Sequence, residues 1–241
     1  MIHLSVEGAV ATVRIDRPER RNALNLEAVE QLDDAFERVD DGAIRALVLC
    51  GTAGHFCAGA DLKELEDLTF TQRLRTMLDR LADLPLVTIA AISGSCMGLG
   101  MQLALGCDLR TATDDARFAV PVAKLGLMVD HWTLERLAAT FGIGAARHLV
   151  LTAQVLDAAD GHRLGFVQEL GDEAAAHALA ARVSTLAPLS VAGSKLGFAA
   201  VAHRPDTTSY EEAFRRAWQS EDLVEGRAAF AERRSPQFRG T

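Results

Sequence analysis

The stretch Thr88–Asp108, TIAAISGSCMGLGMQLALGCD, decides the fold of this chain. Thr88–Ile92 is a run of small and β-branched apolar residues that is too short for a helix, so it predicts a buried strand. Ser93–Met97 is typical of a turn, and from Gly98 the apolar residues follow helical spacing. A strand that leads through glycines into a helix presents unpaired N–H groups and the positive end of the helix dipole. This predicts either a site for a negative oxygen or close packing of the helix on the strand, which glycines also permit.

The positions of the glycines narrow the choice of ligand. Gly94, Gly98 and Gly100 do not follow the G-x-G-x-x-G order of dinucleotide-binding folds, and no Gly-Lys-Ser/Thr follows them. Phosphate binding is therefore disfavoured. A transient oxyanion on a thioester or acyl carbonyl is compatible with the pattern, because backbone donors directed at one oxygen stabilise such a charge.

Length and composition bound the class of protein. The chain has 241 residues, 49% of them apolar, which is enough for one large domain or a domain with an appendage. The net charge of −8 argues against nucleic acid and anionic membranes as partners. No apolar run approaches the roughly 20 residues of a membrane span, and residues 1–11 lack the pattern of a signal peptide. We therefore expect a cytoplasmic protein.

The four cysteines, Cys50, Cys57, Cys96 and Cys107, form no C-x-x-C pair. Neither a zinc site nor a disulfide framework is expected, and we predict no metal. Small buried residues in a reducing compartment are the expected role. Cys57 is also a conceivable nucleophile, but no histidine stands at a diagnostic spacing from it, so a core position is the preferred interpretation.

Hydrophobic periodicity predicts an α/β core followed by helices alone. The expected strands are Ile2–Glu7, Ala9–Ile15, Ala46–Cys50, Thr88–Ile92, Leu109–Ala112 and Phe166–Leu170. The expected helices are Leu26–Asp40 with Asn25 as its N-cap, a segment begun by Asp61, Arg73–Leu84, one starting at Gly98, Trp132–Phe141, Ala145–Leu151, Ala158–Leu164, Glu173–Ala187, Ser190–Ala202 and Ser209–Glu232. In the last of these, Phe214, Trp218, Leu223 and Phe230 recur at helical intervals, which favours packing on a partner subunit or on the core. We expect oligomers.

Five motifs in order resemble the enoyl-CoA hydratase/isomerase (crotonase) superfamily. They are RPERRNALN (17–25), FCAGADL (56–62), IAAISGSCMGLG (89–100), CDLRTATDDARFAVP (107–121) and SEDLVEGRAAFAERRSPQF (220–238). The resemblance implies an α/β spiral of ββα units over residues 1–187 and a helical oligomerisation region over residues 188–241. It also implies homotrimers or dimers of trimers, a role in fatty-acid metabolism, and a coenzyme A (CoA) thioester as ligand, without a tightly bound cofactor.

The same resemblance implies the site. Two backbone N–H groups, those of Ala60 and Leu99, are expected to polarise the thioester oxygen. The CoA portion is expected over two loops, through Arg21, Ala23, Leu24, Ala58, Asp61, Leu62 and Lys63. For Arg21, a phosphate contact and a merely solvated surface position remain alternatives.

The chain departs from the hydratase pattern at both glutamates that activate water. Gln102 and Val122 stand where the family's hydratases carry these carboxylates. An amide has no usable protonation equilibrium near neutral pH and a valine has none at all, so neither can act as a general acid or base. Gln102 can still hold water or the acyl group by hydrogen bonds.

One acid, Asp130, falls where some isomerases and a dehalogenase branch of the family carry a working aspartate. The alternative role is the N-cap of the helix that follows, and the two roles can coexist. The adjacent His131 is either a proton carrier or a surface or cap residue. Trp132 is expected to be a pocket wall or a core residue.

Two functions therefore remain open. The first is binding or carriage of acyl-CoA or enoyl-CoA thioesters without turnover, which the missing carboxylates favour. The alternative is an enoyl-CoA isomerase or atypical hydratase that uses Asp130 as acid or base. The sequence leaves open whether the protein is an enzyme.

Overall fold

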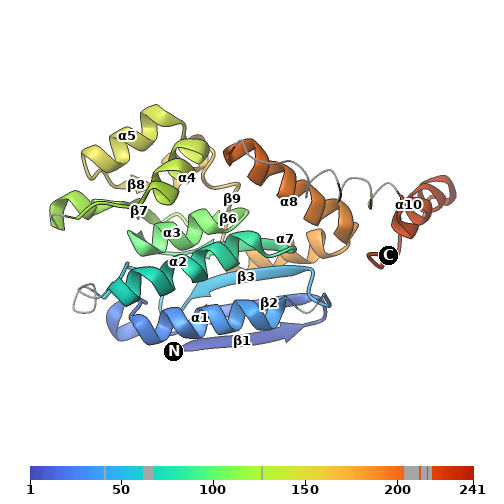
Figure 1. Ribbon diagram of the computed structural model, residues 1–241, viewed down its shortest axis with the longest axis horizontal. Helices are drawn as coiled ribbons and strands as arrows, with labels where there is room; N and C mark the ends of the chain where they lie inside the picture. The colour runs from blue at the N-terminus through green and yellow to red at the C-terminus, as the bar shows by residue number, and fades with distance from the viewer. Residues whose placement is uncertain (41, 62–67, 126, 204–211, 213–215, 217–218) are drawn as a thin grey trace.

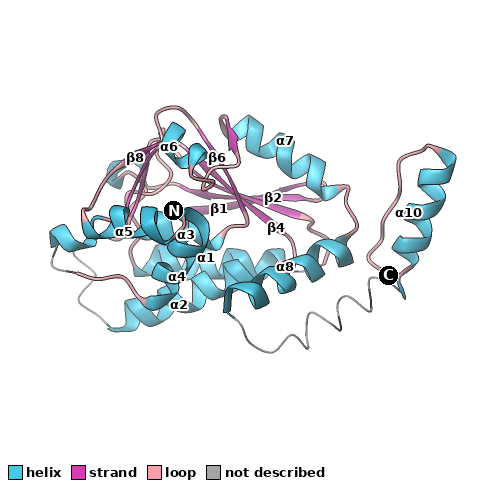
Figure 2. Cartoon of the chain, turned by 90° about the horizontal axis from the view of Figure 1, so that it is seen from above, coloured by secondary structure: helices cyan, strands magenta, loops and turns pink. Residues whose placement is uncertain are grey.

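The computed structural model describes residues 1–40, 42–61, 68–125, 127–203, 212, 216 and 219–241 (Figures 1 and 2). Its main sheet has six strands in the order β1 (Ile2–Glu7), β2 (Val10–Ile15), β3 (Ala46–Gly51), β4 (Val87–Ile92), β6 (Leu109–Ala112) and β9 (Glu169–Leu170). β1 and β2 form the antiparallel hairpin that the sequence predicts, and the other neighbours are parallel. A second sheet has three strands, β5 (Ser95–Met97), β7 (Arg117–Ala119) and β8 (Leu156–Asp157).

Helices cover both faces of the main sheet (Figure 1). The helices of the described residues are α1 (Leu26–Val39), α2 (Leu68–Asp83), α3 (Leu99–Gly106), α4 (His131–Phe141), α5 (Ile143–Leu151), α6 (Ala158–Arg163), α7 (Glu173–Ser184), α8 (Pro188–His203) and α10 (Glu221–Glu232), with 3₁₀ turns η1 (Pro18–Arg20) and η2 (Pro121–Leu125). Leu47 and Leu49 of β3 face the core formed with α1, α2 and α3, whereas Val48 faces α7. A strand buried on both faces reads as a continuous apolar run, which explains the sequence of β3.

Asn25 caps α1 as predicted, because its side chain accepts a hydrogen bond from the N–H of Ala28 at 3.0 Å. α8 begins at Pro188 rather than at Ser190, in keeping with the preference of proline for the first helical turn. Pro188 is also where we place the start of the helical appendage. Among the described residues, no helix combines the length and the apolar content that crossing a membrane requires.

The prediction of a turn at Ser93–Met97 is wrong in part. Ser95–Met97 forms β5, which pairs with β7 in parallel, and Cys96 also bridges to Cys57. These partners lie far away in the sequence, so local pattern could not reveal the strand. The predicted strand Phe166–Leu170 shortens to β9.

Two expectations lie partly outside the residues that the structure describes. They are the helix begun by Asp61 and, in the apolar stripe, Phe214 and Trp218. Leu223 and Phe230 lie in α10, but their side chains are not described. In Figures 1 and 2, α10 lies apart from the sheet and its covering helices.

Candidate active site

The start of α3 is shaped by two glycines. Gly98 has a φ of +51° at the N-cap position, in the region that residues with a side chain rarely adopt. Gly100 lies directly against the backbone of Cys57, so a methyl group added there would collide with the Cys57 carbonyl oxygen and lie 3.1 Å from its Cβ. The helix can therefore approach Cys57 this closely only with glycine at position 100.

The loop that follows β3 runs between β5 and the segment around Leu24. On one side, the N–H of Leu24 donates to the carbonyl of Gly59 at 2.9 Å, and the N–H of Asp61 donates to the carbonyl of Leu24 at 2.7 Å. Because these bonds come from the residues on either side of Ala60, the N–H of Ala60 itself points away from Leu24.

The opposite edge of the same loop faces β5. The N–H of Cys57 donates to the carbonyl of Ser95 at 2.9 Å, and the N–H of Met97 donates to the carbonyl of Cys57 at 3.0 Å. The N–H of Ala60 is thus directed to the side of β5 and α3. Leu99 is the first residue of α3, where an N–H has no partner within the helix. Of the hydrogen bonds in the described ranges, none uses the N–H of Ala60 or Leu99.

The two loops expected to hold CoA lie side by side. The N–H of Ala58 donates to the carbonyl of Arg21 at 3.0 Å, and the side chain of Arg21 is exposed. Ala23 and Ala58 are half-buried, whereas the side chain of Leu24 is fully buried. Asp61 pairs with the guanidinium of Arg17 at 3.9 Å. Leu62 and Lys63 lie outside the described residues.

Gln102 and Asp130 are joined through a buried threonine. The Nε2 of Gln102 donates to the Oγ1 of Thr133 at 2.8 Å, and that hydroxyl donates to the Oδ1 of Asp130 at 2.5 Å. The same Oδ1 accepts the N–H of Thr133 at 3.1 Å, so the N-cap role of Asp130 is confirmed. Its other oxygen, Oδ2, pairs with the Nη1 of Arg75 at 3.2 Å.

The remaining predicted residues are Val122, His131 and Trp132. Val122 is half-buried in η2 and packs against the main core. Asp130, His131 and Trp132 line an open surface pocket of about 520 Å³. His131 is exposed, while Trp132 is buried and stacks under the guanidinium of Arg136, 3.9 Å from the ring centre. Trp132 is therefore a core residue that also forms a pocket wall.

Comparison with known proteins decides the family. A model of the enoyl-CoA hydratase/isomerase family matches residues 5–241. The chain belongs to this family. A Mycobacterium bovis protein named "Probable enoyl-CoA hydratase echA6" is 38% identical over the whole of both chains. The human "Enoyl-CoA hydratase domain-containing protein 2, mitochondrial" is 34% identical over 96% of this chain and 86% of its own length.

Solved structures agree with this assignment. The crystal structure of an enoyl-CoA hydratase/carnithine racemase from Magnetospirillum magneticum matches with a TM-score of 0.93 and 31% identity, over 100% of this chain and 96% of that chain. The predicted crotonase fold is therefore confirmed. As a crotonase-family protein, the chain belongs among proteins that act on CoA thioesters.

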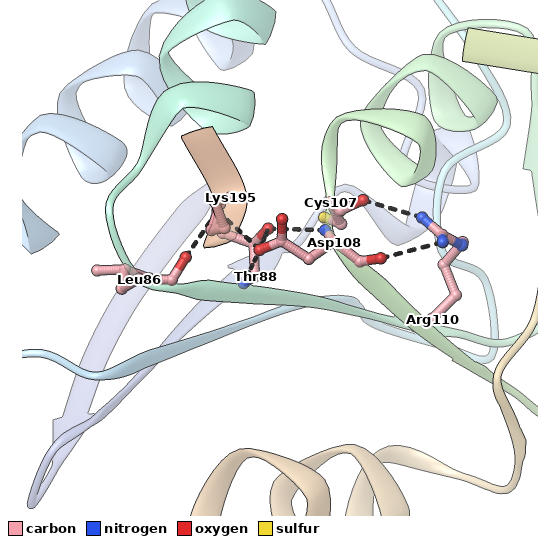
Figure 3. Close-up of polar contacts among 6 residues, drawn as sticks. All are labelled: Leu86, Thr88, Cys107, Asp108, Arg110 and Lys195. Carbon is pink, nitrogen blue, oxygen red and sulfur yellow. Dashed lines mark hydrogen bonds and ion pairs between the residues drawn. The ribbon is translucent and has the colours of Figure 1, made fainter. Parts of the chain in front are cut away.

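In this crotonase, the far end of α3 is held by a buried cation (Figure 3). The guanidinium of Arg110 is 6% exposed and donates to the carbonyls of Ala104 and Cys107 at 2.9 Å each, and to that of Phe166. Burial lowers the pKa of Arg110. The charge sits at the negative end of the α3 dipole, which favours a cation there. Arg110 thus fixes the helix whose other end carries the Leu99 N–H.

Asp108 ties α8 to the same region (Figure 3). Its Oδ2 accepts the N–H of Thr88 at 2.8 Å, the Thr88 hydroxyl at 3.0 Å and the ammonium of Lys195 at 2.7 Å. Lys195 also donates to the carbonyl of Leu86 at 2.7 Å. The pair therefore joins the start of β4, the residues just after α3 and helix α8.

The cysteines of this crotonase are free and buried, as predicted. Burial raises the pKa of Cys57 and of Cys107 to about 12 and that of Cys96 well above its ordinary value. A thiol with such a pKa is almost entirely protonated near neutral pH, so a nucleophilic role for Cys57 has no support. The backbone of Cys57 instead provides the surface against which Gly100 of α3 packs.

Three residues of the site were not predicted from the sequence. Thr133 and Arg75 organise Asp130, and Asn22 organises the loop that precedes Ala58. Asn22 is fully buried with a φ of +60°, and its amide donates to the carbonyls of Thr52 and His55. A local signal for Thr133 was its place three residues after Asp130, because an N-cap side chain accepts the N–H of the second or third helical residue.

Proposed function

We propose that this crotonase binds acyl-CoA or enoyl-CoA thioesters between the N–H groups of Ala60 and Leu99 and does not hydrate them. One observation carries the proposal: in the described ranges the N–H groups of Ala60 and Leu99 have no hydrogen-bond partner, while Gln102 and Val122 stand in place of the hydratase carboxylates. A thioester oxygen is an acceptor that suits two such donors. Water addition needs a group that takes and delivers a proton, and neither side chain can do so.

The CoA portion is proposed to follow Arg21–Leu24 and residues 58–63. The backbone bonds between these two loops support a continuous surface there. Arg21 is the proposed phosphate ligand, since it is exposed and its backbone carbonyl accepts the N–H of Ala58. The fully buried side chain of Leu24 contributes through its backbone position, and Asp61 contributes by holding Arg17.

The alternative function, an isomerase with Asp130 as base, finds a specific obstacle. Both carboxylate oxygens already accept from strong donors, Oδ1 from Thr133 and Oδ2 from Arg75. A base has to direct a free lone pair at the substrate proton within hydrogen-bond reach. Thr133 engages both lone pairs of Oδ1, so Asp130 could accept a proton from an acyl chain only through the second lone pair of Oδ2, beside the Arg75 guanidinium.

Two measurements test the proposal. Isothermal titration of the purified protein with dodecanoyl-CoA should show saturable binding, and a flat trace would contradict the proposal. The ultraviolet absorbance of crotonyl-CoA should stay constant on addition of the protein, and rapid loss at low protein concentration would show hydration. The matched variant Gln102→Glu with Val122→Glu, which restores both carboxylates, is expected to increase the rate of absorbance loss.

We also propose that residues 188–241 form the oligomerisation region of a homotrimer or of a dimer of trimers. On α8, Phe198 is 76% exposed and Leu196 is 40% exposed, and Val224 on α10 is 69% exposed. Exposed large apolar side chains such as these are typical of surfaces that a second subunit covers. Light scattering on the eluting protein should give the mass of three or six chains, and a monomer would contradict the proposal.

A further inference from the structure

Arg110 is a buried cation that is held by neutral groups. Its guanidinium donates to four backbone carbonyls, those of Ala104, Cys107, Asp108 and Phe166. None of the ion pairs in the described ranges includes Arg110. An unneutralised charge in the interior costs free energy even when its N–H groups are satisfied. The structure therefore keeps a positive charge where a neutral donor would avoid that cost.

An ion pair beside Arg110 sets the charge of the whole region (Figure 3). The carboxylate of Asp108 binds the ammonium of Lys195 at 2.7 Å. The side chain of Lys195 is 15% exposed and that of Asp108 is 28% exposed, so solvent screens the pair only in part. The two charges of the pair cancel, whereas the charge of Arg110 does not. We call these three residues the Arg110 cluster, and the cluster carries one positive charge in excess.

The excess charge lies at the opposite end of α3 from the proposed thioester donor. Leu99 is the first residue of the helix, while Ala104 and Cys107, whose carbonyls bind Arg110, lie in its last turn and just beyond it. Eight helical residues span about 12 Å, and nearly all residues of α3 are buried. At an effective dielectric constant near 20, a unit charge about 12 Å away changes an ionisation equilibrium by about tenfold.

We propose that the Arg110 cluster is an electrostatic element that stabilises negative charge on a thioester oxygen bound to the Leu99 N–H. The positive end of the α3 dipole faces that oxygen, and the cluster offsets the negative end of the same dipole, so the two effects add. The residues of the cluster act through the interior and do not contact the ligand. The inference rests on the proposed function, since it needs the oxygen between Ala60 and Leu99.

A thioester that ionises reports the potential at this oxygen directly. Acetoacetyl-CoA loses a proton to solvent from the carbon between its two carbonyl groups, and the enolate that forms shares its negative charge with the thioester oxygen. The enolate and the keto form have different ultraviolet spectra. Spectra of the complex over a series of pH values therefore give the apparent pKa of the bound ligand, and stronger stabilisation of the negative oxygen lowers that pKa.

Two substitutions that break the same ion pair are expected to shift the ligand pKa in opposite directions. Asp108→Asn leaves two positive charges and should lower the pKa of bound acetoacetyl-CoA by about half a unit, since partial exposure screens the change. Lys195→Met leaves the Asp108 carboxylate unneutralised and should raise that pKa by about the same amount. A purely structural role of the pair predicts a raised pKa in both variants, because both loosen the end of α3.

The double variant with Asp108→Asn and Lys195→Met separates charge from structure most sharply. It lacks the ion pair but keeps the excess charge of Arg110, so the ligand pKa should return to the wild-type value. Arg182→Met is the matched control, because it also removes one cation, from an ion pair in which Arg182 is 64% exposed. Solvent screens that position, and the ligand pKa should not change. Thermal unfolding shows which variants are folded, and the double variant tests the proposal if Asp108→Asn alone does not fold.

The outcomes separate this inference from the function on which it rests. Opposite shifts in the two single variants, with recovery in the double variant, would support the electrostatic role. Shifts of the same sign, no shift at all, or a double variant that stays shifted would overturn it while leaving thioester binding intact. Failure of acetoacetyl-CoA to bind the wild-type protein would overturn the proposed function itself.

Discussion

Replacing Gly100 by alanine should damage the proposed thioester site without altering any side chain that contacts the ligand. The added methyl group would collide with the carbonyl oxygen of Cys57 and lie 3.1 Å from both the carbonyl carbon and the Cβ of that residue. These are backbone and near-backbone atoms of a fully buried residue, so no flexible side chain can move aside. The N-terminus of α3, with the Leu99 N–H, has to shift away from Cys57.

The expected loss of stability follows from the crowding that the added methyl group causes at position 100. Extra volume forced into a packed core typically costs 1–3 kcal/mol, so we expect Gly100→Ala to lower the free energy of unfolding by about 2 kcal/mol. In a chain of this size, that corresponds to a fall in Tm of about 4–8 °C. Loss of one hydrogen bond to the thioester oxygen should weaken dodecanoyl-CoA binding by about fivefold.

Gly144 provides the matched control, since it is also a helical glycine. A methyl group added there meets nothing within 4 Å, and the residue is exposed in α5. Gly144→Ala should raise the free energy of unfolding by up to about 1 kcal/mol and leave ligand affinity unchanged. Thermal unfolding and titration of both variants decide the matter. If Gly100→Ala melts with the wild type and binds dodecanoyl-CoA equally well, the argument from the close contact of α3 with Cys57 fails.

Three further predictions follow from buried and paired groups. Cys57 should resist iodoacetamide at pH 8 in the native protein, because burial raises its pKa to about 12, and should react once guanidinium unfolds the chain; rapid native labelling would contradict this. The hydrogen bond from Arg14 lowers the pKa of Glu173 below 4.5, so the stability that Glu173 contributes is present above that pH and lost as pH falls through the lowered value. Because solvent screens this pair, Glu173→Gln should lower the free energy of unfolding, measured with urea, by only about 0.5 kcal/mol at pH 7. The difference from wild type should disappear in acid. A difference that does not change with pH would refute the assignment. Lys195→Met removes the charged donor of Asp108 and should lower the free energy of unfolding by about 2 kcal/mol, whereas an unchanged urea midpoint would show that the contact contributes nothing.

Much of the fold could be predicted from the sequence, because its main elements carry their signals locally. β3 and β4 are apolar runs, α1 has its Asn25 cap, and α3 starts at glycines, and each of these lies where periodicity places it. β5 escaped prediction since its three residues become a strand only by pairing with β7, more than 20 positions away. Short strands of this kind depend on tertiary partners rather than on propensity.

The candidate site was less predictable from the sequence than the fold. The motifs predict the two backbone donors and the positions that lack carboxylates, and the predicted place of Asp130 at a helix start is confirmed. They did not reveal that Arg75 and Thr133 occupy both oxygens of Asp130, because Arg75 stands 55 positions away on another helix. Which lone pairs of a carboxylate remain free is a property of tertiary contacts, and it bears directly on whether Asp130 can act as a base.

Backbone donors and carboxylates differ in how they depend on the fold, and the proposed thioester site without hydratase chemistry rests on this difference. The N–H of Leu99 is placed by the contact of Gly100 with Cys57 and by Arg110 at the other end of α3, and both contacts also support the core. The proton-transfer positions have no such role, because Gln102 is held by a single bond to Thr133 and Val122 simply packs. A chain that keeps this core therefore keeps its N–H groups whatever side chains stand at 102 and 122. It follows that thioester binding and hydration are physically separable in this fold, so each must be measured separately.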